Sequence, residues 1–125
     1  MPKGKLITNG VKLQPHEEMT VEFLLRLGKD IELIPPSNTP HNKRGDLLMD
    51  GLIWETKSPV HSNRRAVERV FYAATLQAEN LIFDLRRNKG PASARLLLEK
   101  CFIHTRRARK MLIITERNEL RTYQK

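Results

Sequence analysis

Residues 45–59, GDLLMDGLIWETKSP, have the pattern of two short apolar strands joined by Asp50-Gly51, and three charged residues, Asp46, Glu55 and Lys57, stand inside those strands. Asp50-Gly51 between alternating residues predicts a β-hairpin with a two-residue turn. In that register Asp46 faces Glu55, and the period of two puts Lys57 on the same face. A three-residue turn would shift the register. The spacing therefore predicts two opposed carboxylates with a lysine beside them.

Opposed carboxylates destabilise a hairpin, so a protein keeps such a pair more readily when a cation bridges it. Mg²⁺ (or Mn²⁺) suits oxygen ligands and retains waters that a substrate can replace. Lys57 would then stabilise a pentavalent phosphate or help to position the attacking water. The alternative is a solvent-facing salt network in which Asp46 and Glu55 share Lys57 and Arg44. This pattern alone favours the network, because charges are common on exposed strands.

A helix predicted over residues 15–27 supplies a further acid. At about 100° per residue, Glu17 lies within roughly 20° of Leu24 on the apolar face. Glu17 is either an N-terminal cap of the helix or a third carboxylate for the metal. A second helix, predicted over 63–79, carries Gln77 on its inward face, which suits a core amide and an active-site residue equally well.

The net charge of +9 is concentrated in the last third of the chain. Residues 1–85 hold 11 Lys+Arg and 11 Asp+Glu, whereas residues 86–125 hold 12 and 3. This distribution favours a polyanionic partner, and nucleic acid first. A solvated basic face and a patch for an acidic protein are the alternatives. The residues predicted to contact the backbone of the nucleic acid are Arg86, Arg87, Lys89, Arg106, Arg107, Arg109 and Lys110.

The order of predicted elements is α-β-β-β-α-β-α-β, which indicates a single α/β domain over residues 1–125 with a central mixed sheet. Residues 1–13 are predicted to be loosely ordered, and residues 35–45 form a long loop. The predicted helices cover 15–27, 63–79 and 91–105, and the predicted strands cover 30–34, 46–49, 52–58, 80–85, 111–115 and 120–123. Residues 86–125 form the basic C-terminal part.

Several classes of protein do not fit the composition. The lone Cys101 excludes an intrachain disulfide and a multi-cysteine zinc site. No apolar run approaches the ~20 residues that span a bilayer, so no membrane anchor is expected. The first residues lack the apolar segment of a secretion signal, and we expect a cytosolic protein.

The hairpin residues resemble the motif of the PD-(D/E)XK nuclease superfamily. In that motif an acid ends one hairpin strand and E-x-K lies on the next, which here corresponds to Gly45-Asp46 and Glu55-Thr56-Lys57. Gly45 stands where the motif usually has proline. The resemblance implies a restriction-endonuclease-like αβββαβ core, in which helices flank a central mixed sheet.

A closer resemblance covers residues 16–85, in the blocks HEEMTVEFLLRLGKDIELIPP, GDLLMDGLIWETKSP and AATLQAENLIFDL. These blocks are similar to the C-terminal nuclease toxin domains of contact-dependent growth inhibition systems. The resemblance implies a catalytic set of Glu17, Asp46, Glu55 and Lys57, with the three acids as metal ligands and additional roles for Ser58 and Gln77. It also implies a divalent metal, a nucleic-acid substrate and a cognate immunity protein.

The expected function is a metal-dependent endonuclease that hydrolyses phosphodiester bonds, with tRNA favoured as substrate and DNA second. Its expected place of action is the bacterial cytosol, in a target cell if the toxin is delivered. The chain is expected to be either an excised toxin domain or a stand-alone relative. Two other classes stay open, a non-catalytic nucleic-acid-binding module and a protein-interaction domain with a basic face.

Overall fold

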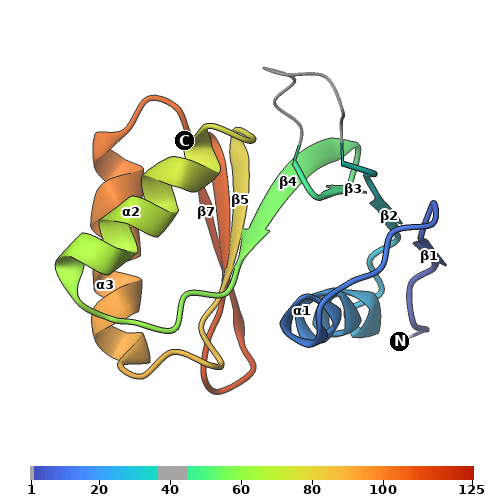
Figure 1. Ribbon diagram of the computed structural model, residues 1–125, viewed down its shortest axis with the longest axis horizontal. Coiled ribbons are helices and arrows are strands. Elements are labelled where there is room, and N and C mark those ends of the chain that lie inside the picture. Colours follow the sequence, from blue (N-terminus) through green and yellow to red (C-terminus); the bar gives the residue numbers. More distant parts are fainter. Residues whose placement is uncertain (1, 37–44) are drawn as a thin grey trace.

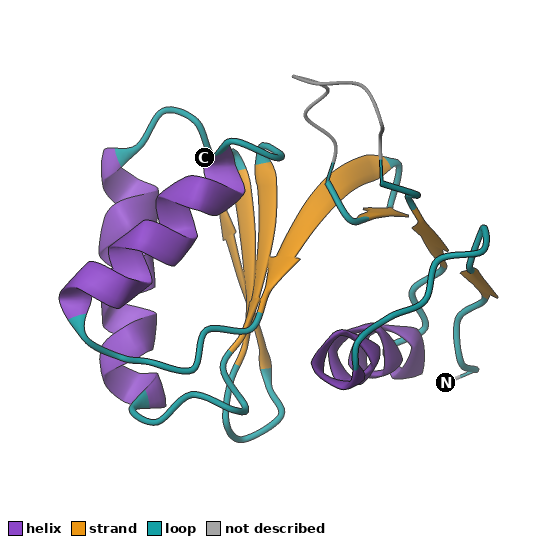
Figure 2. Ribbon diagram, in the orientation of Figure 1, coloured by secondary structure: helices purple, strands orange, loops and turns teal. Residues whose placement is uncertain are grey.

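The computed structural model describes residues 2–36 and 45–125, which form a seven-stranded mixed sheet and three helices (Figures 1 and 2). The strands lie side by side in chain order, from β1 at one edge to β7 at the other. The elements are β1 Leu6–Ile7, α1 Pro15–Arg26, β2 Ile31–Leu33, β3 Leu47–Met49, β4 Leu52–Lys57, α2 Arg64–Thr75, β5 Asn80–Asp84, α3 Pro91–His104, β6 Lys110–Ile114 and β7 Leu120–Gln124.

The structure confirms the predicted α/β class and the central mixed sheet. The run from α1 to β5 has the order αβββαβ, as the resemblance implied. Whether this core belongs to the PD-(D/E)XK superfamily stays a prediction. Most of the predicted long loop falls on residues 37–44, which lie outside the described residues.

The N-terminal segment, which was predicted to be loosely ordered, contains a short strand. β1 pairs in parallel with β2, with Leu6 opposite Ile31. The backbone N–H of Gly4 donates to the carbonyl of Leu25 in α1, at 2.7 Å. The sequence did not indicate this strand, because it has only two residues, Leu6 and Ile7. Its partner strand β2 also lies about 25 residues further along the chain.

Helices cover both faces of the sheet (Figure 2). On one face, Val21 and Leu24 of α1 pack in a core with Trp54 and Ile82. On the other face, α2 and α3 pack over the parallel strands in a core that includes Phe71, Phe83, Ala94 and Leu98. Strand alternation separates these two sets, because neighbouring residues of a strand point to opposite faces. In the part of the chain that the structure describes, no helix is long and apolar enough to cross a bilayer.

β4 is the central strand of the sheet, with three strands on either side. It pairs antiparallel with β3 on one side and parallel with β5 on the other. Figure 1 shows β4 passing between the half that carries α1 and the half that carries α2 and α3. Residues on β4 are therefore within reach of both halves, and β4 carries Glu55 and Lys57.

Candidate active site

The turn of the β3–β4 hairpin has the geometry that the sequence predicts. Asp50 and Gly51 have φ angles of 54° and 76°, as a two-residue type I′ turn requires. β3 and β4 then pair in the predicted register: Leu47 with Trp54, Leu48 with Ile53, and Met49 with Leu52. Trp54 is buried, and its indole N–H donates to the carbonyl of Met49, at 3.0 Å.

Asp46 departs from the register predicted for it. Its backbone N–H donates to the carbonyl of Trp54, at 2.7 Å, so Asp46 and Leu47 both oppose Trp54, which is the pattern of a β-bulge. The prediction that Asp46 directly faces Glu55 in a regular ladder is therefore wrong. The Asp46 carboxylate instead accepts hydrogen bonds from the backbone N–H and the hydroxyl of Thr56, at 2.8 and 3.0 Å.

Gly45 makes this bulge sterically possible. A Cβ at position 45 would lie 2.5 Å from the carbonyl oxygen of Trp54 and 2.9 Å from a side-chain carbon of Ile53. Neither proline nor any other residue with a Cβ fits unless the backbone moves. The close approach accounts for glycine at the position where the PD-(D/E)XK motif usually has proline.

Glu55 is a buried carboxyl group between two other charges. It is 6% exposed, and its Oε2 lies 3.3 Å from the Nζ of Lys57. The pKa of Glu55 is raised to about 7, chiefly by burial and then by the neighbouring charge of Asp46, while Lys57 acts to lower it. Asp46 and Glu55 thus still meet, although the bulge places them differently from the predicted ladder pair. Arg44, the other cation of the predicted salt network, lies outside the described residues.

Glu17 reaches the same place from the start of α1, where it is half-buried. Its Oε1 accepts the backbone N–H of Gln14, at 2.8 Å, which forms a capping box with the Gln14 side chain. The structure therefore confirms that Glu17 caps the helix. Within residues 2–36 and 45–125, no three His, Cys, Asp or Glu side chains are grouped closely enough to hold a metal ion. Metal ligation by Glu17 stays a prediction.

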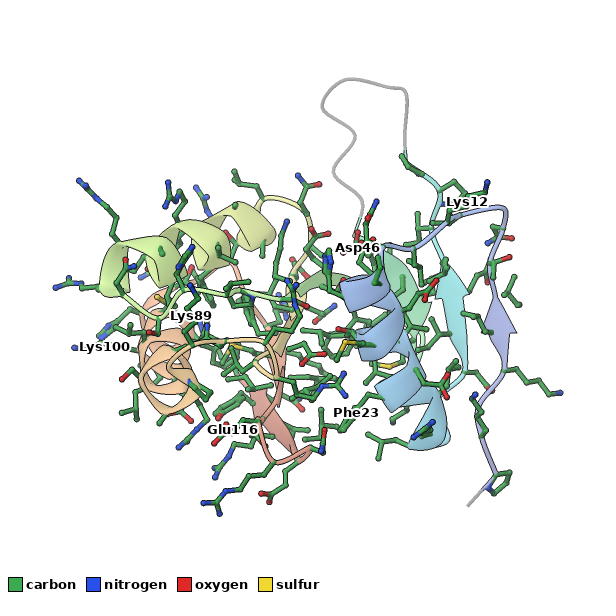
Figure 3. All side chains as sticks on the ribbon, turned by 60° about the horizontal axis from the view of Figure 1, so that its bottom comes forward. Lys12, Phe23, Asp46, Lys89, Lys100 and Glu116 are labelled. Carbon is green, nitrogen blue, oxygen red and sulfur yellow. The ribbon has the colours of Figure 1, made fainter. Side chains whose placement is uncertain are left out.

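A cavity of about 420 Å³ is lined by the predicted residues Glu17, Asp46, Glu55 and Gln77. It is bounded by α1, the β3–β4 hairpin and the turn that follows α2. Figure 3 shows Asp46 at this boundary, beside the ribbon of α1. The polar and charged side chains among its lining residues include Lys12, Glu17, Asp46, Glu55, Thr56 and Gln77. A smaller cavity adjoins it, lined among others by His16, Lys57 and Ser58.

Gln77 reaches the cavity by a different route from the one predicted. α2 ends at Thr75 rather than at residue 79, so Gln77 is exposed and lies beyond the helix. The N–H groups of Gln77 and Ala78 both donate to the carbonyl of Ala74, and this turn leads into β5. The prediction of an inward helical amide is wrong, whereas the cavity position keeps an active-site role open. Ser58 follows β4 directly, and its carbonyl accepts a bond from Arg87, at 3.4 Å.

Arg86 differs from the other predicted nucleic-acid contacts, because its guanidinium is already bound. Two of its nitrogens donate to the buried Asp84, at 3.0 and 2.7 Å, and one donates to the carbonyl of Met19. The guanidinium also lies 5.1 Å from the ring centroid of Phe23. The Asp84 carboxylate accepts a further bond from Thr20 of α1, at 2.8 Å. Arg86 therefore holds α1 against β5, which the sequence did not indicate.

The remaining predicted contacts fall into two groups at opposite ends of the parallel strands. Arg87 and Lys89 follow the end of β5, on the same side as Lys57 at the end of β4. The other group, Arg106, Arg107, Arg109 and Lys110, surrounds the start of β6. Since β4, β5 and β6 run parallel, their starts lie at one edge of the sheet and their ends at the opposite edge. The two groups are therefore separated by the length of these strands. The prediction of one basic segment therefore does not correspond to one surface.

Sequence reasoning did not identify Thr56 or Lys12 as residues of the site. The role of Thr56 could have been predicted from the sequence. A carboxylate at the end of a hairpin strand needs hydrogen-bond donors, and the middle residue of E-x-K lies close to it on the neighbouring strand. Lys12 gave no such signal, because its place depends on how the N-terminal segment crosses α1.

Comparison with known proteins supports the growth-inhibition resemblance. The family described as the contact-dependent growth inhibition CdiA C-terminal domain matches residues 43–120, more than half of the chain. The fold is similar to a solved CdiA-CT/CdiI toxin and immunity complex from Burkholderia pseudomallei, with a TM-score of 0.73 and 17% identity, over 98% of this chain and 100% of that one. The comparison with curated proteins gives no match. The chain belongs to the family of CdiA C-terminal domains of contact-dependent growth inhibition.

Proposed function

We propose that this chain is a toxin domain of contact-dependent growth inhibition that hydrolyses phosphodiester bonds in nucleic acid. The observation that carries the proposal is the convergence of Asp46, Glu55 and Lys57 in one cavity, with a buried carboxyl group at its centre. Burying Glu55 beside another acid costs stability, and a catalytic role explains why the protein keeps this arrangement. Acids with perturbed pKa values cluster at functional sites. tRNA is the favoured substrate on the growth-inhibition resemblance, and DNA is second.

The proposed roles follow from the contacts of each residue. Asp46 is held by two hydrogen bonds from Thr56, which orient its carboxylate. Lys57 is 37% exposed in its side chain and is paired with Glu55. Its ammonium group can therefore contact a phosphate at the cavity and stabilise the charge that develops there. Gln77 and Ser58 lie at the borders of the two cavities, where they can contact the substrate.

Asp46 and Glu55 are suited to a Mg²⁺ (or Mn²⁺) ion. Mg²⁺ takes one or two carboxylates and completes its shell with water or phosphate oxygens, so a set of three protein ligands is not required. A bound cation would supply positive charge at the phosphate and activate a water molecule. It would also favour ionised Glu55, whose pKa is raised to about 7 without it. Glu17, engaged in the capping box, would support the cation through water.

The proposal is tested by incubating the protein with total bacterial RNA and with plasmid DNA, each in Mg²⁺, Mn²⁺ or EDTA. Lys57→Ala and Glu55→Gln should abolish cleavage. Glu18→Gln is the matched control, because Glu18 is an exposed acid of the same helix as Glu17. Metal-dependent loss of discrete RNA bands supports the tRNA nuclease, and plasmid nicking alone supports the DNase. Cleavage that survives in both variants contradicts the proposed site.

A non-catalytic nucleic-acid-binding module is the second candidate. It is favoured by the net charge of +9. In that case RNA is bound with equal affinity in EDTA and in Mg²⁺, and nothing is cleaved.

Toxins of this kind imply a cognate immunity protein, and we propose one for this chain. The structural relative was solved as a toxin and immunity complex. The proposed place of action is the cytosol of a target bacterium. Expression of the chain in a bacterium without the immunity protein should arrest growth, whereas the Lys57→Ala variant should not.

A further inference from the structure

Two segments run side by side away from the candidate site. They are the β4–α2 connection, residues 58–63, and the β5–α3 turn, residues 85–90. The backbone N–H of Lys89 donates to the carbonyl of Val60, at 2.9 Å. The Asn88 side chain donates to the carbonyls of Pro59 and His61, at 2.9 and 3.0 Å, and is buried. These bonds fix the two segments to each other.

Basic side chains follow this pair of segments outward from the site. Arg87 lies beside Ser58, directly after Lys57, and Lys89 lies beside Val60. Arg65 stands at the outer end, in the first turn of α2. All three are exposed, and none forms a salt bridge within the described part of the chain. We name Arg87, Lys89 and Arg65 the basic track.

The track has an uncompensated charge. Residues 57–65 and 85–90 contain no Asp or Glu. The acid nearest in the α2 sequence, Glu68, is paired with Arg64, at 2.6 Å. At the other end of the sheet, by contrast, Arg109 lies 3.6 Å from Glu79. The charge distribution along the sequence did not show this difference between the two ends of the sheet. The arginines of α2 belong to the first 85 residues, in which the positive and negative charges cancel.

We propose that the basic track holds the sugar-phosphate backbone of the nucleic acid that enters the site. The inference rests on the proposed function and deepens it, because it names the path of the substrate. From Lys57 to Arg65 the connection spans eight residue steps, at most roughly 28 Å if fully extended. Successive phosphates of one strand rise about 3.4 Å along a helix. The upper limit therefore corresponds to about eight phosphate steps beyond the one at Lys57.

The chemistry of the track suits a phosphate backbone better than an acidic protein. Protein interfaces need an apolar, well-packed centre, whereas the side chains exposed along residues 57–65 and 85–90 are all polar or charged. They are His61, Asn63, Arg64 and the three cations of the track. Phosphate positioning depends mainly on Lys and Arg side chains, and these are what the track presents. Figure 3 shows Lys89 on the half of the molecule that carries α2 and α3, so the track leads across that half.

The test compares two triple variants, each of which removes three positive charges. The track variant is Arg65→Gln/Arg87→Gln/Lys89→Gln, and the control is Arg106→Gln/Arg107→Gln/Arg109→Gln. Both are made in a Glu55→Gln background and measured in EDTA, so that binding is observed without cleavage. The probes are a tRNA, a single-stranded DNA of similar length and a polyglutamate chain. Affinity is measured over a range of salt concentrations, and circular dichroism checks that each variant is folded.

The track variant should bind nucleic acid about 100-fold more weakly at 0.1 M salt, and its log–log salt slope should fall by about 2, since each single-strand phosphate contact contributes about 0.7. The control should lose less than tenfold. Equal losses in the two variants would overturn the inference, and so would polyglutamate binding as tight as that of nucleic acid. If wild type binds through the track but cleaves nothing in any metal, the nuclease proposal fails and the track stands. If wild type cleaves and the track variant binds normally, only the track fails.

Discussion

The buried Glu55 carboxyl should make the protein lose stability as the pH rises. Its pKa is raised from the ordinary value of 4.5 to about 7 in the folded protein, chiefly by burial and then by the charge of Asp46. Between these two values the folded state binds a proton that the unfolded chain releases, so the free energy of unfolding falls with increasing pH. At about 1.36 kcal/mol per pKa unit, the loss from this group reaches about 3 kcal/mol between pH 4 and pH 8.5.

The perturbation that tests this reasoning is Glu55→Gln, which keeps the shape of the protonated side chain and removes its titration. Urea unfolding in EDTA should give similar free energies for wild type and variant at pH 4. At pH 8.5 the variant should be more stable by about 3 kcal/mol, a large share of the ~5–15 kcal/mol that stabilises a domain. The difference between the two curves isolates Glu55 from the other titrating groups.

Glu18→Gln is the control for this experiment, because Glu18 is exposed to solvent. A flat difference curve for Glu55→Gln would show that Glu55 ionises normally in the folded protein. A variant that loses stability relative to wild type at high pH would refute the argument outright, because it would mean that the charged form is favoured by its surroundings.

Three further predictions follow from single contacts. Glu17→Gln should leave the melting temperature unchanged, because glutamine also serves a capping box, but should reduce cleavage at least tenfold if Glu17 supports the metal; a loss of both in thermal melts and nuclease assays would mean that the residue acts only through the helix. Thr20→Val should lower the free energy of unfolding by ~1–3 kcal/mol, since the buried Asp84 loses a donor, and Thr20→Ser should restore it; equal stability of all three proteins in urea would count against this contact. Gly45→Ala should cost about 1–3 kcal/mol through the clash with Trp54, and a variant as stable as wild type would show that the bulge is not required.

The cation site gives a prediction of its own, based on mass action. Mg²⁺ at 100 times its dissociation constant should stabilise wild type by about 2.7 kcal/mol. At a fixed Mg²⁺ concentration the effect should be larger at pH 8 than at pH 6, since the cation binds ionised Glu55. Thermal melts of wild type and Asp46→Asn, each with Mg²⁺ or EDTA, measure it. The same stabilisation in both proteins would place the cation elsewhere.

Local signals determined the hairpin and most of the elements. Asp50-Gly51 predicts a two-residue turn because both positions need positive φ, and the register of β3 with β4 follows from the turn. The spacing of Glu55 and Lys57 on one strand puts both on one face without any help from the rest of the fold. The starts of two helices also followed from the sequence, because a proline is the first residue of each, Pro15 in α1 and Pro91 in α3.

Only the tertiary structure decided how these pieces meet. The bulge at Asp46 depends on the backbone of Gly45 approaching Trp54, a contact between strands that no local propensity encodes. Arg86 looks like any other exposed arginine until Asp84 and α1 enclose it. The basic residues of the last third divide between the two ends of the sheet because β5 and β6 are parallel, so that α3 must carry the chain back from one end to the other. The net charge of a segment can be counted from the sequence alone. The electrostatic potential at a site depends on the distances between charged side chains, and only the fold determines these distances.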